Sequence, residues 1–366
     1  MELLKELVER NASDLHLVAA HAPVIRADGR LIPVEGDTEI LEREAVAKLF
    51  EPFLSAKQMA ALKDKQDIHT SVVSDSFVSE RYGEARRFRA CIFWDLNGVS
   101  ASLRVIPVNI PTLSQLFPPE TEVTFRRFTQ QKRGLILVVG ATGSGKSTTT
   151  ASMIETINIE RRERIFTIEE PIEYLHTSKT SLISQREVGT DLESFEQGGL
   201  SAFRSDPDVI LVGEIRTPEA LRIALALAET GHLVFSTIHA DSVSEAVRRM
   251  IESFPDARET MQSMIARSLN AIIGQRLVPR AGGFGRVAAH EIMIVNSRIR
   301  RLIDEGKIDL NLAIEAGRGE GMCTMDDSLL GLYRNGSIDY DRAWNFMNDR
   351  DRLGPRPVEE GEGPTA

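Results

Sequence analysis

Eight consecutive residues near the middle of the chain have the spacing of a phosphate-binding loop. They follow the apolar run 135–139 and are Gly140, Ala141, Thr142, Gly143, Ser144, Gly145, Lys146 and Ser147. Glycines matter here because backbone N–H groups can wrap around an anion only where no Cβ intervenes, and a following helix adds the positive end of its dipole. The pattern therefore predicts a strand, an anion-binding loop and a helix, in that order.

The same loop predicts which parts of a nucleotide its side chains reach. The lysine of such a loop, here Lys146, contacts the β- and γ-phosphates, and the hydroxyl of Ser147 is a ligand of Mg²⁺. Thr148 follows at once and is counted with the nucleotide-binding residues. A glycine turn that matches by chance is the alternative, and its frequency in a chain of this length is on the order of one in a hundred. We therefore expect the chain to bind ATP and Mg²⁺.

Three more predicted strands end in side chains that could act on a bound nucleotide. The strands span residues 164–168, 209–212 and 233–238, and Glu169, Glu214 and His239 stand just beyond their ends. Since ligands of open α/β sheets bind beyond the carboxyl ends of the strands, these side chains are expected near the loop. Glu214 would hold the hydration shell of Mg²⁺ or orient the attacking water, and His239 would sense the γ-phosphate. Each alone is more often a helix cap or a solvated residue, but together they favour phosphoryl transfer to water.

Alternation of strands and helices between residues 120 and 295 predicts the fold class. Apolar, strand-like runs alternate there with helical patterns, which is typical of an α/β fold with parallel strands and crossover helices. Helix starts agree with this, because Thr217 can cap a helix that begins at Pro218, and Ser242 with Glu245 has the spacing of a capping box. Residues 1–106 mix short helical and strand-like patterns, which predicts a smaller α+β domain.

Prolines and composition set the expected domain boundaries. Four prolines between residues 107 and 119 disfavour helix interiors and sheet pairing, so an interdomain linker is expected there. The end of the chain is rich in Pro, Gly and Glu and has few large apolar residues, so it is expected to be disordered. The expected division is an N-terminal domain at 1–106, a linker at 107–119, an ATPase core at 120–295, a helical region at 296–353 and a disordered tail at 354–366.

The composition argues against several classes of function. Among 366 residues, 54 Asp and Glu outnumber 44 Lys and Arg, and this acidic balance argues against extended duplex binding, which depends on neutralising phosphates. Cys91 and Cys323 are the only cysteines and lie far apart, so neither a zinc site nor a disulfide framework is expected. No apolar run reaches membrane-spanning length, and the chain starts with acidic residues where a signal peptide would be basic. We expect a cytoplasmic protein that neither inserts into the membrane nor binds nucleic acid.

Four motifs in fixed order resemble those of the type II/IV secretion ATPase superfamily. They correspond to its Walker A, Asp box, Walker B and His box motifs and occupy residues 140–147, 167–174, 204–216 and 230–239. The chain is similar in particular to the PilT-like and PilU-like ATPases that retract type IV pili, and the similarity extends to residues 12–17 and 321–326. The resemblance implies a RecA-like P-loop core with an N-terminal PAS-like domain, and ATP hydrolysis that powers pilus retraction and twitching motility.

The resemblance also implies roles for individual residues. Glu169 and Glu214 would be the catalytic and metal-organising carboxylates, and His232 and His239 would be the histidines of the His box. Arg204 opens the Walker B motif and would belong to the catalytic residues. Arginines of the N-terminal domain would reach the phosphates across a cleft or an interface, or would instead be solvated or form ordinary salt bridges. The candidates are Arg87, Arg89 and Arg104.

The assembly implied by the resemblance is a ring-shaped homohexamer at the cytoplasmic face of the inner membrane. Each N-terminal domain would sit on the core of a neighbouring subunit, with ATP bound between domains. An inner-membrane pilus platform protein would be the partner that receives the force, and a paralogous retraction ATPase would be a second partner.

Departures from the family pattern leave alternatives open. The Asp box usually reads Glu-Asp-Pro, where this chain has Glu-Glu-Pro at 169–171, and Arg298 and Arg301 interrupt the outline of the Ala-Ile-Arg-Asn-Leu motif of the retraction ATPases. A principal motor and an accessory paralogue therefore both remain open. The runner-up function is a pilus-assembly or type II secretion ATPase, although such ATPases usually carry a tetracysteine zinc module. A regulatory module that binds nucleotide without hydrolysis is a further alternative, against which the complete catalytic set argues.

Overall fold

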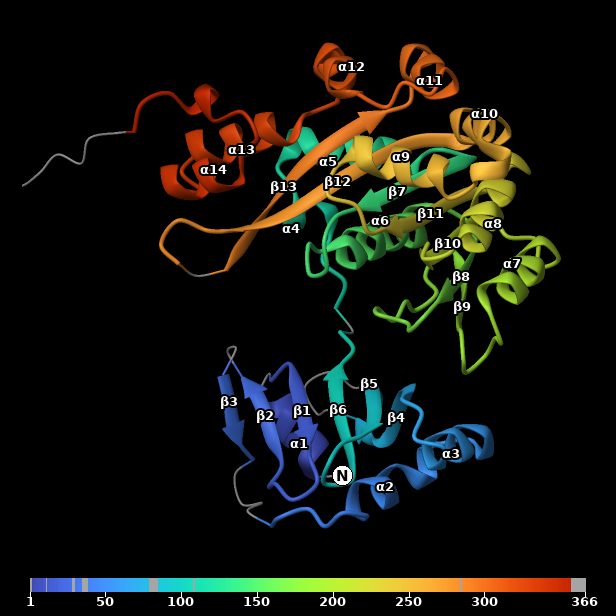
Figure 1. The fold of residues 1–366 in the computed structure, drawn as a ribbon, viewed down its shortest axis with the longest axis vertical. Helices are drawn as coiled ribbons and strands as arrows, with labels where there is room; N and C mark the ends of the chain where they lie inside the picture. The colour runs from blue at the N-terminus through green and yellow to red at the C-terminus, as the bar shows by residue number, and fades with distance from the viewer. Residues whose placement is uncertain are drawn as a thin grey trace, which may run out of the picture. The chain divides into compact units, whose positions relative to one another are not determined.

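The computed structural model describes residues 2–10, 12–27, 30–34, 39–78, 85–107, 109–283 and 285–356, apart from the side chains of residues 71, 73–78, 85 and 86. The chain forms two compact units (Figure 1). The first unit contains residues 1–109 together with segments 170–175 and 187–193, and the second contains residues 110–169, 176–186 and 194–366. The tail expected at 354–366 lies outside the described residues from 357 onwards.

The first unit is built on a six-stranded sheet in the order β3-β2-β1-β6-β5-β4, in which neighbouring strands are antiparallel. Side chains alternate along β5, where Phe88, Ala90 and Ile92 are buried and Arg87 and Arg89 are half-buried, as in a sheet with one face on a core. The strands are β1 (Asp14–Leu17), β2 (Val24–Ala27), β3 (Arg30–Pro33), β4 (Ile68–Val78), β5 (Ala85–Trp94) and β6 (Val99–Val105), and the helices are α1 (Glu2–Glu9), α2 (Ala45–Phe50), η1 (Glu51–Phe53) and α3 (Ala56–Lys63). The predicted α+β composition is confirmed.

The second unit is built on a seven-stranded sheet in the order β13-β12-β7-β11-β10-β8-β9. The pairs that join β12, β7, β11, β10 and β8 are parallel, and β13 runs antiparallel to β12. The strands are β7 (Gly134–Val139), β8 (Arg164–Glu169), β9 (Leu182–Glu187), β10 (Val209–Glu214), β11 (Leu233–Ile238), β12 (Leu269–Pro279) and β13 (Arg286–Ile294). The predicted parallel α/β core is confirmed, and its strands β7 and β11 are buried along their whole length.

Two details of the core strands differ from the prediction. Glu169 and Glu214 are the last residues of β8 and β10 rather than residues just beyond the ends of these strands. The hairpin of β12 and β13 was not predicted. Its first strand follows a helix without a turn signal and carries Asn270, Gln275 and Arg276 among its apolar residues, so it lacks a continuous apolar run.

The helices of the second unit are α4 (Leu113–Leu116), α5 (Pro119–Thr129), α6 (Lys146–Glu160), α7 (Phe195–Phe203), α8 (Pro218–Glu229), α9 (Val243–Glu252), η2 (Pro255–Ala257), α10 (Arg258–Ser268), α11 (Ser297–Asp304), α12 (Asn311–Ala316), η3 (Arg318–Glu320), α13 (Met325–Arg334), α14 (Tyr340–Phe346) and η4 (Arg350–Leu353). The start of α8 is confirmed, because Thr217 Oγ1 accepts the N–H of Ala220. The capping box at α9 is shifted: Ser242 accepts from Glu245, but the Glu245 carboxylate accepts the N–H of Asp241.

The proline-rich stretch expected as a linker contains helical structure. The short helix α4 lies inside 107–119, and Thr112 and Gln115 form a capping box at its start. Pro119 is the first residue of α5, a position where the missing N–H of proline costs nothing. Phe117 of this stretch, together with Phe125 and Phe128 of α5, is buried against the core sheet. The segment after α4 is therefore part of the hydrophobic core of the second unit.

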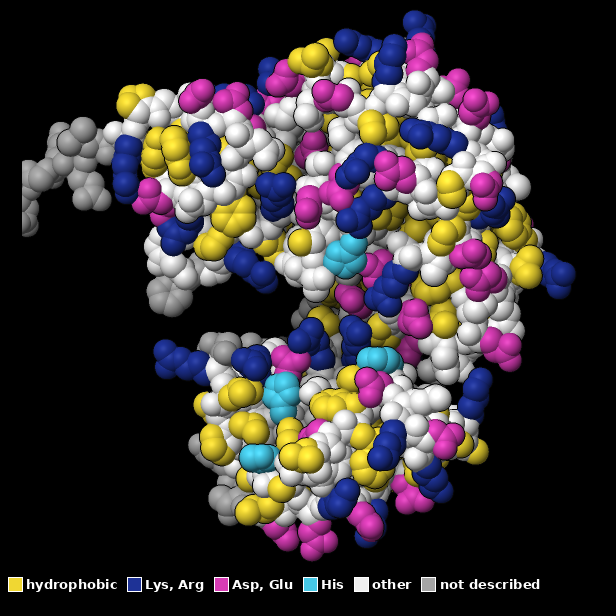
Figure 2. All heavy atoms as spheres, in the orientation of Figure 1, with side chains coloured by type: hydrophobic (Ala, Val, Ile, Leu, Met, Phe, Trp, Pro, Cys, Tyr) yellow, Lys and Arg dark blue, Asp and Glu magenta, His cyan; other side chains and the backbone are white. Residues whose placement is uncertain are grey.

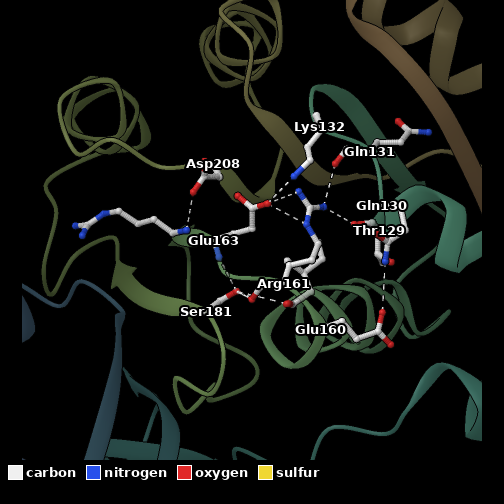
Figure 3. A network of polar contacts seen from close by, with 11 residues as sticks. Thr129, Gln130, Gln131, Lys132, Glu160, Arg161, Glu163, Ser181 and Asp208 are labelled. Carbon is white, nitrogen blue, oxygen red and sulfur yellow. Dashed lines mark hydrogen bonds and ion pairs between the residues drawn. The ribbon is translucent and has the colours of Figure 1, made fainter.

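A polar network joins the amino ends of the core strands (Figure 3). The buried Arg161 donates to the backbone carbonyls of Thr129 and Gln131, and its Nη2 lies 2.9 Å from Glu163 Oε1. Lys132 Nζ also lies 2.9 Å from that carboxylate. Burial acts to raise the pKa of Glu163, but hydrogen bonds from Lys132 and Arg161 outweigh it and the pKa is lowered. Since this is the edge opposite the carboxyl ends of the strands, the network stabilises the sheet without lining a nucleotide site.

Candidate nucleotide-binding site

The phosphate-binding loop connects β7 to α6 and takes a conformation that needs glycine. Gly140, Gly143 and Gly145 have φ values of 155°, 76° and 88°. A Cβ on Gly140 would lie 2.4 Å from the Gln275 carbonyl oxygen, and one on Gly145 would lie 2.6 Å from Gln275 Nε2. No described side chain caps α6 at Gly145, so the N–H groups of its first turn are available to an anion. The predicted strand, loop and helix are confirmed.

Hydrogen-bond donors gather at this loop. The side chain of Lys146 is buried, and its Nζ donates to the carbonyls of Gly140 and Ala141 at 2.9 and 3.1 Å. Ser144 Oγ is buried without a hydrogen-bond partner among the described residues. Ser147 and Thr148 lie half-buried in the first turn of α6. An ammonium group, a hydroxyl and the end of a helix therefore surround one loop, and this set fits a phosphate group.

Glu169 is a buried carboxylate that accepts hydrogen bonds from two uncharged side chains. It ends β8 and is 7% exposed, and its Oε1 accepts from Thr167 Oγ1 at 2.7 Å and from Gln185 Nε2 at 3.2 Å. Gln185 is fixed in turn, because its Oε1 accepts the N–H of His176 at 2.8 Å. The motifs did not point to Thr167 or Gln185 as supporting residues, and Gln185 lies on β9, for which no strand was predicted.

Glu214 and His239 form a second group, which reaches the loop. Glu214 Oε2 lies 2.7 Å from Arg216, and Glu214 Oε1 lies 3.2 Å from His239 Nε2. The same His239 nitrogen is 3.5 Å from Thr142 Oγ1 in the phosphate-binding loop. Since Ile168 and Val212 are paired in register, the strands that end in Glu169 and Glu214 lie side by side. The structure thus brings Glu169, Glu214 and His239 to the loop edge of the sheet.

Two predicted site residues lie at the other edge of the core sheet. His232 precedes the amino end of β11, where its Nδ1 is 2.9 Å from the Leu227 carbonyl oxygen and its ring contacts Phe203 edge-on. Arg204 is exposed and follows α7. The structure does not bring these residues together with the phosphate-binding loop of the same chain, so their part in nucleotide binding stays a prediction.

Two of the three N-terminal arginines have carboxylate partners within the first unit. Arg87 Nη2 lies 3.4 Å from Glu187, and Arg104 Nε lies 2.8 Å from Asp14. Burial acts to raise the pKa of Asp14, but hydrogen bonds from Arg104 and Ser13 outweigh it and lower the pKa. Arg89 stands opposite Arg104 in the register of β5 and β6. The salt bridges predicted as the alternative for these arginines are present for two of the three, and their contact with phosphate stays a prediction.

The loop, the parallel sheet and the carboxylates that end neighbouring strands define a P-loop nucleoside triphosphatase with a RecA-like core. The family model for type II/IV secretion system proteins matches residues 1–300. The chain belongs to this family, and it is an ATP-hydrolysing enzyme of the PilT-like group.

Similar proteins support this placement along nearly the whole chain. The type IV pilus retraction ATPase PilT of Pseudomonas aeruginosa is 42% identical over 344 residues, which cover 93% of this chain and 96% of PilT. The type IV pilus ATPase PilU of the same organism is 35% identical over 344 residues, with 93% and 87% covered. A crystal structure of the pilus retraction motor PilT with bound ADP has a TM-score of 0.84 and 38% identity, and covers 96% of this chain and 97% of that one. In the described part of the chain, no helix has the length and apolar character needed to cross a bilayer.

Proposed function

We propose that the chain is the ATPase that retracts type IV pili. The observation that carries this proposal is the grouping of Lys146, Glu169, Glu214 and His239 at one edge of the sheet, in a chain 42% identical to PilT. The same set argues against a module that binds nucleotide without hydrolysing it. On the face of the second unit drawn in Figure 2, basic and acidic side chains are interspersed, which supports a protein partner over nucleic acid.

The two carboxylates suit different tasks. Glu169 is buried and held in one orientation by Thr167 and Gln185, which suits a group that orients the attacking water and takes its proton. Glu214 is more exposed and already paired with Arg216 and His239, which suits a group in the hydration shell of a cation. Ser147 and Glu214 would hold Mg²⁺, which when bound neutralises phosphate charge. Lys146 would exchange its bonds to the loop carbonyls for bonds to the β- and γ-phosphates.

The proposed assembly is a homohexamer. Arg204 and His232 lie at the sheet edge away from their own phosphate-binding loop, so they are suited to contact a neighbouring subunit. The arginines of the proposed PAS-like N-terminal domain, Arg87, Arg89 and Arg104, would complete the site on docking. We place the hexamer at the cytoplasmic face of the inner membrane, where a pilus platform protein would receive the force. The division into domain, linker, core, helical region and tail predicted from the sequence stays part of this proposal.

Two observations favour different roles for the chain, one the principal motor and the other an accessory paralogue. Identity is higher to PilT than to PilU, at 42% against 35% over stretches of the same length, which favours the principal motor. Arg298 and Arg301 are exposed on α11 and replace residues of the retraction motif, which favours the paralogue. We propose the principal motor, because the difference in identity reflects the whole chain and not two surface positions.

Deletion of the gene in a piliated host tests the proposal. Loss of a retraction motor leaves cells with surface pili, in normal or increased number, that no longer support twitching motility. Bald cells would contradict the proposal and favour the assembly ATPase. Normal twitching with full retraction force would contradict both the principal and the accessory role, and complementation with the wild-type chain is the control.

A further inference from the structure

Gln275 lies where the phosphate-binding loop leaves the sheet. Its strand β12 pairs with β7 up to Gly274 and Val139, so Gln275 is the next residue along and stands beside Gly140. Gln275 is 3% exposed. Burying a carboxamide costs free energy unless both its oxygen and its nitrogen are hydrogen-bonded. The hydrogen-bond partners of Gln275 therefore indicate its role.

Both ends of the Gln275 carboxamide are bonded to the loop and its helix. Nε2 donates to the carbonyl oxygen of Ser144 at 2.6 Å, and Oε1 accepts from Thr149 Oγ1 at 2.7 Å. A carbonyl oxygen can only accept, so the Ser144 contact fixes which end of the amide is nitrogen. The side chain therefore joins the loop to the first turns of α6.

The bond to Ser144 has a consequence for phosphate binding. A trans peptide unit is planar, and its C=O and N–H groups point in opposite directions. With the Ser144 carbonyl held toward Gln275, the N–H of Gly145 must point away from Gln275. That N–H belongs to the loop whose backbone donors cradle phosphate in this class of site. Gln275 thus fixes the direction of one anion-binding donor.

The same hairpin holds the loop at a second carbonyl. Arg286 of β13 donates from Nη1 to the Gly143 carbonyl oxygen at 3.4 Å. The side chain and backbone of Gln275 also fill the space that a Cβ on Gly145 or Gly140 would need. The β12–β13 hairpin therefore packs against this loop and restricts the conformations that the loop can take.

We propose that Gln275 is a positioning residue that keeps the phosphate-binding loop in its anion-binding conformation. This inference rests on the proposed function, because the anion is the phosphate chain of ATP or ADP. It acts through the loop and contacts neither the reacting atoms nor the catalytic carboxylates. Its loss should weaken nucleotide binding and leave the chemical step largely intact.

The test compares Gln275→Leu with a matched control on the same strand. Gln275→Leu keeps the volume and removes both hydrogen bonds, and we expect ADP affinity to fall 10- to 100-fold, as for the loss of one oriented donor to a charged group. Asn270→Leu removes a carboxamide at the other end of β12, where Asn270 Nδ2 donates to Gln131 and to the Arg133 carbonyl, and should leave affinity within about twofold. The probe is fluorescently labelled ADP titrated into the full-length chain.

Steady-state kinetics separate positioning from a general loss of structure. Positioning predicts a raised KM for ATP with kcat changed less than about threefold, so that high ATP restores the rate. A merely structural role predicts a lower kcat at unchanged KM, in proportion to the unfolded fraction. If Gln275→Leu does not fold, Gln275→Asn serves instead, because it keeps a buried amide that is too short to bridge Ser144 and Thr149.

Two results would overturn the inference without touching the proposed function. One is ADP affinity within twofold of wild type in the folded Gln275 variant, and the other is an equal loss in Asn270→Leu. Absence of nucleotide binding in the wild-type chain would instead defeat the proposed function itself. A raised KM at preserved kcat in the Gln275 variant alone supports the inference.

Discussion

Replacing Glu155 should remove a defined part of the pH dependence of the stability of the core. Glu155 lies on α6, and its Oε2 accepts from His176 Nδ1 at 2.9 Å and from Asn158 Nδ2 at 3.0 Å, while Lys179 Nζ binds its Oε1. Burial acts to raise the pKa of Glu155, but the hydrogen bonds from His176, Lys179 and Asn158 outweigh it and lower the pKa from 4.5 to about 2. The ionised form is therefore the one that the fold stabilises.

The size and the sign of the effect follow from that shift. A difference of roughly 2.5 pKa units corresponds to about 3 kcal/mol of folding free energy. Because the pKa is lowered in the fold, this contribution is complete above pH 4.5 and is lost as the pH falls toward 2. Glu155→Gln keeps an amide oxygen that still accepts one bond, and Lys179 is half-exposed and screened, so we expect a loss of about 2 kcal/mol at pH 7.

Urea unfolding at pH 7 and pH 3.5 measures this difference. The gap between wild type and Glu155→Gln should shrink at the lower pH, where the wild-type carboxylate begins to lose its advantage. Glu160→Gln is the matched control on the same helix, because its pair with Arg126 is on the surface and should contribute less than about 1 kcal/mol. A gap that stays constant with pH, or that equals the control, would refute the reasoning.

Further predictions concern the site. Lys146→Ala should abolish nucleotide binding measured with fluorescent ADP, because the loop loses its cation. Glu169→Gln and Glu214→Gln should both bind ATP and should both lower kcat by about 10²-fold or more. Only Glu214→Gln should raise the Mg²⁺ concentration needed for the half-maximal rate. If only Glu169→Gln raises that concentration, the two carboxylates have each other's role. Arg104→Ala should lower kcat by about 10³-fold, whereas Asp14→Asn, which removes the salt-bridge partner of Arg104, should not. Equal kcat values in the two variants would show that Arg104 serves only the salt bridge.

The sequence predicted those features whose signal is local. The strand, loop and helix around Lys146 follow from eight adjacent residues, and the start of α8 follows from Thr217 and Pro218. Gln275 could not be found in this way, because it matches no motif and stands in a strand without a continuous apolar run. Its role depends on β12 lying next to β7, and sheet order is a property of tertiary packing.

Sheet order also decides which predicted residues act on one another. Along the chain the loop is followed by Glu169, then Glu214 and then His239, whereas across the sheet the loop strand β7 neighbours β11, then β10 and then β8. His239, the last of the three along the chain, is therefore the one beside the loop, and Glu214 lies between it and Glu169. On its other side β7 pairs with β12, which supplies Gln275. The loop is thus held from one neighbouring strand by a carboxamide and contacted by a histidine that follows the other. We therefore expect a change at either position to alter nucleotide binding without altering a motif residue of the loop.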